Sequence, residues 1–390
     1  MARALLAMVL LALLGGCSLL GLSALDVEAV GISAQQPSNV AVYLWAAHGD
    51  EPLTELSLGD FRIYENDQEL SSSEIGLTLL DRTAAAEHHT LLLVDMSGSS
   101  NEQRQDIARA VAPFVARVRQ AQGVTVYAFA GTATPTLVGE FPRLAGGNEP
   151  RRLPELESYL PADTSRDLHG AILEGLKQLD ARLMRAQKPL RVGSLVVFTR
   201  GTDLAGRVSY DQVQTALDET RHLVFALGVG DSDDDGLSDI GRNGVVRAHA
   251  MNTIGIGFED TATLVDANLR RYYLLSYCTP ARAGRRQLRV EVTTTDREGE
   301  PIAGDVELEF NADGFGPGCD PTAPPRFVVQ APPATGGPPA PEPGSGVSVD
   351  AAPAAPSTPA PTDAEPAPDA SAEGTDEIAP PPDRPGYAPE

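Results

Sequence analysis

The sequence predicts an α/β domain with a doubly wound, mostly parallel sheet, flanked by small antiparallel β segments and followed by a disordered tail. Short apolar segments alternate with amphipathic segments between residues 88 and 277, the pattern of parallel strands joined by helices. Alternating β-branched segments lie on both sides of that region. From residue 321 onward Pro, Ala, Gly and acidic residues dominate, and they bury too little apolar surface to offset the entropy of ordering.

The elements of the α/β domain follow from its apolar periodicity. The first strand, 90-TLLLVD-95, is continuously apolar, as expected for a strand covered on both faces. A helix is expected at 101–123, with Gly123 as its C-cap. Further strands are expected at 124–131, 192–199 and 222–230, with further helices at 167–184 and 209–221. Ligands of such sheets bind at the carboxyl ends of the strands, where Asp95 lies.

Two β segments are expected outside this domain. Residues 39–87 predict a small antiparallel unit that packs on the α/β domain, and residues 278–320 contain a hairpin that extends this unit. Residues 17–38 show no clear periodicity and are interpreted as a tether. The tail is expected to span 321–390.

The first sixteen residues are interpreted as an export signal. Arg3 supplies the positive start, and an apolar run too short to span a bilayer follows it. The run ends in 14-LGGC-17, which resembles a bacterial lipobox and implies that Cys17 carries lipid as the first mature residue. An ordinary signal peptide is the alternative. Ser18 resembles the residue that follows Cys in lipoproteins sent to an outer membrane, so we expect a membrane-anchored, extracytoplasmic protein.

The other two cysteines form an even pair if Cys17 is lipidated. Because an exported chain enters an oxidising compartment, we expect a disulfide between Cys278 and Cys319. Two reduced thiols are the alternative.

The charge of the 390-residue chain excludes one class of partner. Its formal net charge is −24, whereas nucleic-acid binding requires a basic face. Much of the acidity lies in segments that are not expected to pack, so it indicates solubility rather than a particular partner.

The stretch 91-LLLVDMSGSS-100 places three oxygen ligands, Asp95, Ser97 and Ser99, on one loop at a strand end. Followed by a helix, it resembles the von Willebrand factor A (VWA) domain and its metal-ion-dependent adhesion site, Asp-x-Ser-x-Ser. The resemblance covers residues 88–277 and includes three further strands: 125-TVYAFAG-131, 195-LVVFTRGTD-203 and 223-LVFALGVG-230. It implies a module that binds a partner protein, in part through Mg²⁺.

Two positions depart from the family pattern. Arg166 aligns with the second-loop Thr, and Arg200 takes the place of the third-loop Asp. A guanidinium about 4 Å from a divalent ion, at an effective dielectric near 20, repels that ion by roughly 8 kcal/mol. We therefore expect a metal-free site in which Asp95 pairs with Arg200 or Arg166.

In this metal-free interpretation the hydroxyls of Ser97 and Ser99 cap the following helix. The contact surface is then formed by Asp95, Arg166 and Arg200, whose exposed arginines would favour an acidic partner. The alternative is Mg²⁺-dependent adhesion through Asp95, Ser97 and Ser99.

A second acidic loop, 231-DSDDDGLSDIGR-242, fits part of a calcium-binding string. Its candidate ligands are Asp231, Asp233, Asp235 and Asp239. Arg242 stands where an EF-hand requires a bidentate Glu, so a complete EF-hand is excluded. The alternative is an acidic turn that leads into the first turn of a helix.

No catalytic constellation is evident. The serines of the Asp-x-Ser-x-Ser loop have no partner base, and neither a nucleophile elbow nor a phosphate-binding loop is present. We therefore expect a non-enzymatic protein-binding module at the cell envelope, with an unknown protein as its ligand. The competing hypothesis is a structural envelope protein whose acidic tail makes the interactions.

Overall fold

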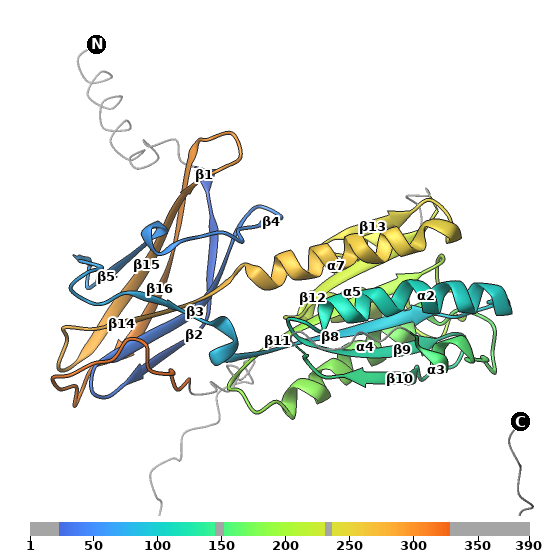
Figure 1. The fold of residues 1–390 in the computed structure, drawn as a ribbon, viewed down its shortest axis with the longest axis horizontal. Helices are drawn as coiled ribbons and strands as arrows, with labels where there is room; N and C mark the ends of the chain where they lie inside the picture. Colours follow the sequence, from blue (N-terminus) through green and yellow to red (C-terminus); the bar gives the residue numbers. More distant parts are fainter. Residues whose placement is uncertain (1–22, 145–151, 231–235, 328–390) are drawn as a thin grey trace, which may run out of the picture. The chain divides into compact units, whose positions relative to one another are not determined.

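The computed structural model describes residues 23–144, 152–230 and 236–327, which form a mixed α/β fold built on three sheets (Figure 1). Several expected features lie outside these residues: the export signal, Cys17, the tail beyond residue 327, and Asp231, Asp233 and Asp235. No helix within the described ranges is both long enough and apolar enough to cross a membrane.

The central sheet has the strand order β10-β9-β8-β11-β12-β13. Its strands are β8 (Ala86–Asp95), β9 (Gly123–Phe129), β10 (Thr136–Phe141), β11 (Leu190–Thr199), β12 (Leu223–Val229) and β13 (Val245–Ala248). All pairs are parallel except β10 with β9. The mixed α/β fold with a mostly parallel sheet is therefore confirmed. The carboxyl ends of its parallel strands share one edge, here called the loop edge.

Helices cover both faces of this sheet, which is why its inner strands β8, β11 and β12 are almost entirely buried. The α-helices are α2 (Asn101–Val118), α3 (Pro154–Glu157), α4 (Leu168–Met184), α5 (Tyr210–Glu219), α6 (Leu237–Ile240) and α7 (Ile254–Arg270). Leu92 and Val94 of β8 pack with α2 and α7 on one face, whereas Leu91 and Leu93 pack with α4 and α5 on the other. Figure 1 shows α2 and α7 side by side.

Helix α2 ends earlier than the sequence predicts. Its last helical residue is Val118, and Gly123 begins β9 instead of capping the helix. A Cβ at Gly123 would lie 2.6 Å from the His89 ring. Glycine is therefore required at this position so that β9 can approach β8.

The other two sheets form a β-sandwich around a shared apolar core. One sheet contains β2 (Asp26–Gln35), β3 (Asn39–His48), β14 (Tyr272–Cys278) and β7 (Thr78–Leu80), with β4 (Glu51–Pro52) paired to β3. The other contains β1 (Ser23–Ala24), β16 (Pro301–Asn311), β15 (Arg285–Thr295), β5 (Phe61–Glu65) and β6 (Gln68–Leu70). The short 3₁₀ helices are η2 (Leu58–Asp60), η3 (Arg82–Ala84) and η4 (Met251–Thr253).

The sandwich corrects three expected boundaries. Much of the expected tether is strand β2, whose small and polar residues hide its periodicity but whose backbone pairs with β3. The expected β unit at 39–87 is split between both sheets, and each sheet is completed by strands that follow the α/β domain. Strand β14, expected inside that domain, lies between β3 and β7. The α/β domain is therefore an insertion in the sandwich.

The sandwich and the central sheet share an apolar junction. Tyr43 of β3 and Tyr272 of β14 point to the opposite side from the sandwich core and pack with Leu190 and Val192 at the start of β11. Phe327 joins the same cluster. The expected tail therefore cannot begin at residue 321, because Phe327 is buried.

Candidate binding site

Asp95 lies at the loop edge, at the end of β8, and its side chain is 0% exposed. Its Oδ1 accepts hydrogen bonds from Ser97 N at 2.9 Å and Ser97 Oγ at 2.5 Å. Its Oδ2 accepts from Arg166 Nε at 2.7 Å and Arg200 N at 2.9 Å. Both carboxylate oxygens are thus already satisfied within the chain.

The two arginines reach Asp95 from different loops. Arg166 precedes α4 and also donates from Nη1 to Thr202 O at 3.0 Å. Arg200 follows β11, donates from Nη2 to Ser97 O, and places Nη2 3.7 Å from Asp95 Oδ1. The buried carboxylate therefore holds two guanidinium groups and joins three segments of the loop edge.

The prediction that Arg166 and Arg200 are exposed is wrong. Their side chains are only 13% and 12% exposed, because Asp95 draws both guanidinium groups inward. Burial lowers the pKa of Arg200, the nearby Arg166 lowers it further, and Asp95 opposes both effects. Asp95, Arg166 and Arg200 thus support the loops, while other residues form the outer surface.

The prediction that Ser97 and Ser99 cap the following helix is also wrong. Ser97 donates its hydroxyl to Asp95, and Ser99 Oγ is buried without a partner among the described residues. Ser100 is the N-cap of α2, where its Oγ accepts from Gln103 N at 3.2 Å. The cap is Ser100 because α2 begins at Asn101, directly after it.

Thr199 and Gly201 were missed by sequence reasoning. Thr199 Oγ1 donates to Gly201 O at 2.7 Å and lies 3.5 Å from Asp95 Oδ2. Gly201 has a φ of +147°, and a Cβ there would lie 3.0 Å from Arg166 Nη1. A glycine at this turn therefore leaves room for the arginine. The only available signal was the short string 199-TRG-201 at a strand end.

The residues of this site do not fit a divalent cation. Mg²⁺ requires near-octahedral oxygen ligands, whereas both oxygens of Asp95 face N–H or O–H donors and two guanidinium groups adjoin them. Elsewhere in the described ranges, no group of three His, Cys, Asp or Glu side chains could hold a metal ion.

A third arginine, also missed by sequence reasoning, organises the neighbouring loops. Arg207 donates from Nε to Gly131 O at 2.9 Å, and its Nη2 lies 3.2 Å from Asp163 Oδ2. Its Nε also lies 3.7 Å from Oδ2 of Asp167, the buried N-cap of α4. Burial raises the pKa of Asp167, and Asp203 contributes in the same direction. Arg207 thus connects the loops that follow β9 and β11.

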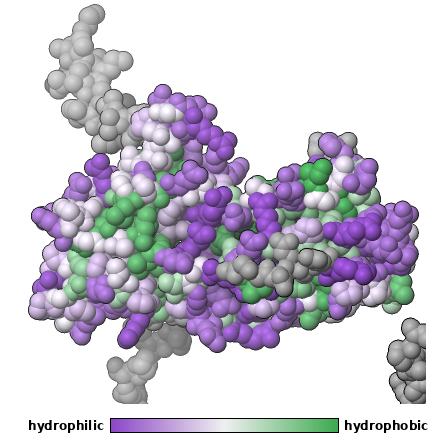
Figure 2. Space-filling model, viewed as in Figure 1, coloured by the Kyte–Doolittle hydropathy of each residue, from purple (hydrophilic) through white to green (hydrophobic). Residues whose placement is uncertain are grey.

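Exposed apolar side chains occur on segments that lead to and from the loop edge. Leu160 lies between α3 and α4 and is 75% exposed, and Leu204 lies in the loop after β11 and is 67% exposed. Ile256, in the first turn of α7, is 63% exposed. Leu204 N donates to the main-chain O of Arg166 at 2.8 Å, and Arg166 Nη1 donates to Thr202 O at 3.0 Å, so Arg166 holds this loop through both its backbone and its side chain. Figure 2 shows hydrophobic areas between hydrophilic ones on the visible face.

These leucines could have been noticed in the sequence as single large apolar residues inside polar loop segments, 158-SYLPADTS-165 and 202-TDLAGRVS-209.

One candidate calcium ligand lies within the described residues. Asp239 is in α6, and its Oδ2 accepts a hydrogen bond from Tyr210 at 2.5 Å. It therefore ties α6 to the start of α5. The other three aspartates of that proposed site lie outside the described residues.

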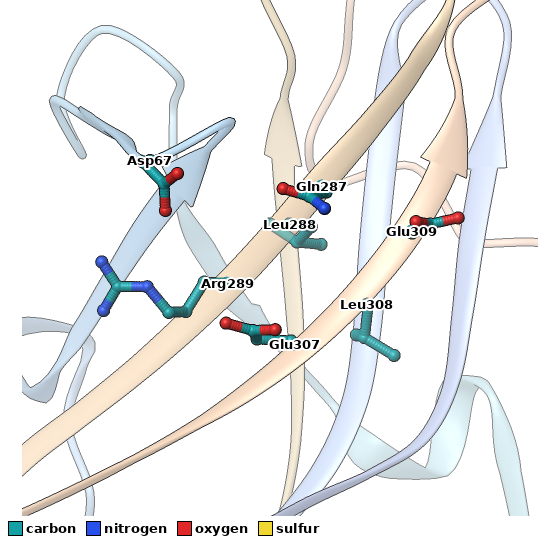
Figure 3. Close-up of a pocket in the computed structure, with 7 residues that line it drawn as sticks. All are labelled: Asp67, Gln287, Leu288, Arg289, Glu307, Leu308 and Glu309. Carbon is teal, nitrogen blue, oxygen red and sulfur yellow. The ribbon is translucent and has the colours of Figure 1, made fainter.

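A hollow of about 310 Å³ lies on the sandwich, away from the predicted site. Figure 3 shows its lining residues on β15, β16 and the turn after β5: Asp67, Gln287, Leu288, Arg289, Glu307, Leu308 and Glu309. Arg289 is already engaged, because it lies over the Tyr64 ring at 3.9 Å and donates to Glu291 at 3.1 Å. Its charge is therefore neutralised within the sheet.

No protein-family model and no curated protein matches this chain. Among solved structures, proximal thread matrix protein 1 from the mussel byssus is 16% identical, with 52% of this chain and 49% of that chain covered and a TM-score of 0.33. The chain thus spans about half the length of that structure.

Two further structures are similar at the same level. A variant of the PilB minor pilin from Streptococcus sanguinis is 13% identical, covering 66% of this chain and 81% of its own, with a TM-score of 0.34. The SpRpn10 VWA domain is 10% identical, covering 45% and 95%, with a TM-score of 0.32. These scores are too low to assign a family.

Proposed function

We propose that this chain is a membrane-anchored, extracytoplasmic lipoprotein that presents a VWA-like protein-binding module and holds its partner without a metal ion. Lipid on Cys17 supplies the anchor, and the loop edge of the central sheet is the contact face. The partner is a protein of the envelope or cell surface.

The saturation of Asp95 is the observation that carries this proposal. A metal-dependent site needs a carboxylate with at least one free oxygen directed at the ion. Asp95 instead accepts hydrogen bonds at both of its oxygens, and one of them comes from the side chain of Arg166. A charge-assisted bond of this kind replaces the attraction that a cation would supply.

The contact side chains in this proposal are Leu160, Leu204 and Ile256. They are exposed on the loop between α3 and α4, the loop after β11, and the first turn of α7. Large apolar side chains held on a rigid loop lose little entropy on binding, and burying them in a partner supplies affinity. We therefore expect a partner with an apolar surface, in place of the acidic one expected from sequence.

Affinity capture from envelope extracts tests the contact face. The full chain and Leu204→Asp are compared, with Met184→Asp as the matched control because Met184 is equally exposed at the far end of α4. We expect Leu204→Asp to weaken capture of one defined partner by at least about tenfold, while Met184→Asp binds normally. Equal capture by both variants contradicts the proposed face.

Removing residues 328–390 tests the competing hypothesis that the acidic tail makes the contact. The cut is placed after Phe327 because that residue belongs to the folded core. Retained capture by the truncated chain favours the loop edge, and loss of capture favours the tail.

Metal dependence is tested by repeating the capture with a chelator and by titrating the full chain with Mg²⁺ in a calorimeter. We expect the same partner capture with and without the chelator. We also expect no heat of Mg²⁺ binding in the calorimeter. Submillimolar Mg²⁺ affinity that disappears in Asp95→Ala would overturn the metal-independent proposal and favour adhesion through Asp95, Ser97 and Ser99.

A further inference from the structure

The chain segment after β16 returns along the turn between β2 and β3. Gly316 N donates to Pro37 O at 2.8 Å, Ser38 Oγ donates to Gly318 O at 3.3 Å, and Asn39 Nδ2 donates to Asp320 O. The contacts run in order along both segments. Residues 314–327 are called the strap below.

The last part of the strap is held by two more hydrogen bonds. Arg326 N donates to Gln35 Oε1 at 3.1 Å, and Ser33 Oγ donates to Arg326 O at 2.7 Å. The strap belongs to none of the paired strands in the described part of the chain. Phe315 is buried in the sandwich core at the start of the strap. Beyond Phe315 the strap makes a few separate polar contacts and no continuous ladder.

Phe327 anchors the end of the strap at the apolar junction. It is buried with Tyr43 and Tyr272 of the sandwich and with Leu190 and Val192 of the central sheet. A Cβ added to Gly31 of β2 would lie 3.0 Å from Leu190 Cδ2 and 3.3 Å from Phe327 Cδ1. The absence of a side chain at residue 31 thus leaves space for both apolar groups.

The Cys278–Cys319 disulfide fastens the strap to the end of β14. Both cysteines are only partly buried, and the neighbours Gly318 and Asp320 are exposed. A small dithiol can therefore reach the bond in the folded protein, unlike a disulfide enclosed in the core.

We propose that the strap is a thiol-sensitive latch that closes the junction between the sandwich and the α/β domain. One thiolate of a dithiol attacks a sulfur of the Cys278–Cys319 bond, forms a mixed disulfide and releases the other cysteine as a thiol. The second thiol of the reagent then resolves the mixed disulfide. Two electrons and two protons reach the protein, and the reagent becomes a disulfide.

Opening the bond removes the covalent restraint that keeps the strap at high effective concentration beside β2 and β14. The hydrogen bonds beyond Phe315 and the packing of Phe327 then open as a local unit, while Phe315 stays in the sandwich core. Their departure uncovers the apolar surface around Gly31 and Leu190. The latch lies at the junction, and its action is independent of partner binding at the loop edge.

Hydrogen exchange by mass spectrometry tests the latch on the full chain, oxidised and after treatment with dithiothreitol. We expect peptides that contain the Gly316 and Arg326 amides to exchange at least about tenfold faster after reduction, while β8 remains protected. Unchanged exchange in the strap overturns the proposal. Equally faster amide exchange in β8 also overturns the proposal, because the disulfide would then support the whole fold.

The double variant Cys278→Ser with Cys319→Ser should show the fast strap exchange without any reductant. Phe327→Ala in the oxidised chain separates the anchor from the bond. We expect faster exchange at Arg326 but unchanged exchange at Gly316, because the disulfide still holds the first half of the strap. A double variant that exchanges like the oxidised parent overturns the latch.

Discussion

Arg166 donates its Nε–H to Asp95 Oδ2 at 2.7 Å, between a carboxylate that is 0% exposed and a guanidinium that is 13% exposed. This one bond joins the end of β8 to the loop before α4. Because Arg166 also accepts backbone hydrogen bonds from Leu204 and Ala205, it connects the buried carboxylate to the outer loop. The shape of the loop edge thus depends on an ion pair inside it.

Arg166→Ala should destabilise the protein by about 3–5 kcal/mol, because it removes the guanidinium that hydrogen-bonds the buried Asp95 and leaves only the more distant Arg200 beside it. Arg152→Ala is the matched control, since Arg152 pairs with Glu157 on the exposed surface and such pairs contribute little. Urea unfolding of both variants measures the difference. If Arg166→Ala loses no more unfolding free energy than Arg152→Ala, the structural role of the Arg166–Asp95 pair is refuted.

The double variant Arg166→Thr with Arg200→Asp should gain Mg²⁺ binding. It removes two positive charges and adds one carboxylate, and each unit charge about 4 Å from a divalent ion contributes roughly 8 kcal/mol at an effective dielectric near 20. Calorimetry of parent and variant checks this. Adding Asp95→Ala to the double variant should abolish the gained binding, and persistence of binding would place the ion elsewhere.

The protein should lose stability in mild acid because of two adjacent buried histidines. Burial lowers the pKa of His88 to about 3 and that of His89 to about 4, with nearby arginines acting in the same direction. The folded state keeps both rings neutral, so their contribution is complete above the ordinary pKa near 6.5 and is lost as pH falls toward 4 and 3.

Each pH unit below 6.5 costs about 1.4 kcal/mol per buried histidine. Unfolding at pH 5 should therefore require roughly 4 kcal/mol less than at pH 7.5. Urea titrations at the two pH values measure this. His88→Gln with His89→Gln should flatten the dependence, and a slope that stays unchanged in that variant would assign the acid sensitivity to other groups.

Tyr277→Phe should destabilise the sandwich by about 2 kcal/mol. Tyr277 donates its hydroxyl to Glu65 Oε1 at 2.9 Å inside the core, where Thr279 Oγ1 binds the other carboxylate oxygen at 3.0 Å. Tyr210→Phe is the control, because its bond to Asp239 is exposed. Chemical denaturation should show a clearly larger loss of unfolding free energy for Tyr277→Phe than for Tyr210→Phe. Equal losses would contradict the importance of burial for the Glu65 bond.

Local patterns in the sequence were sufficient for much of the α/β domain. The continuous apolar run that ends at Asp95 predicted a strand covered on both faces, and β8 has helices on each side. The two departures from the adhesion-site pattern predicted an ion pair at Asp95, and both arginines lie against it. The even pair of cysteines is joined as a disulfide.

Other features depended on partners distant in sequence. Strand β2 has few large apolar residues, and its pairing with β3 decides that it is a strand. The hydroxyl of Ser97 was expected at the helix cap, but it donates to the buried Asp95, and α2 begins only at Asn101. The exposure of Leu160 and Leu204 could not be derived from composition, because loops bury or expose single leucines according to their surroundings.

The sequence by itself determined the alternation of strands and helices and the apolar run that ends in Asp95, because both depend on residues close together in the chain. Only the tertiary structure decided that the α/β domain is inserted in a sandwich and that Arg166 and Arg200 face inward. The reason is that strand pairing and the burial of a charge depend on segments brought together from distant positions, which no local pattern records.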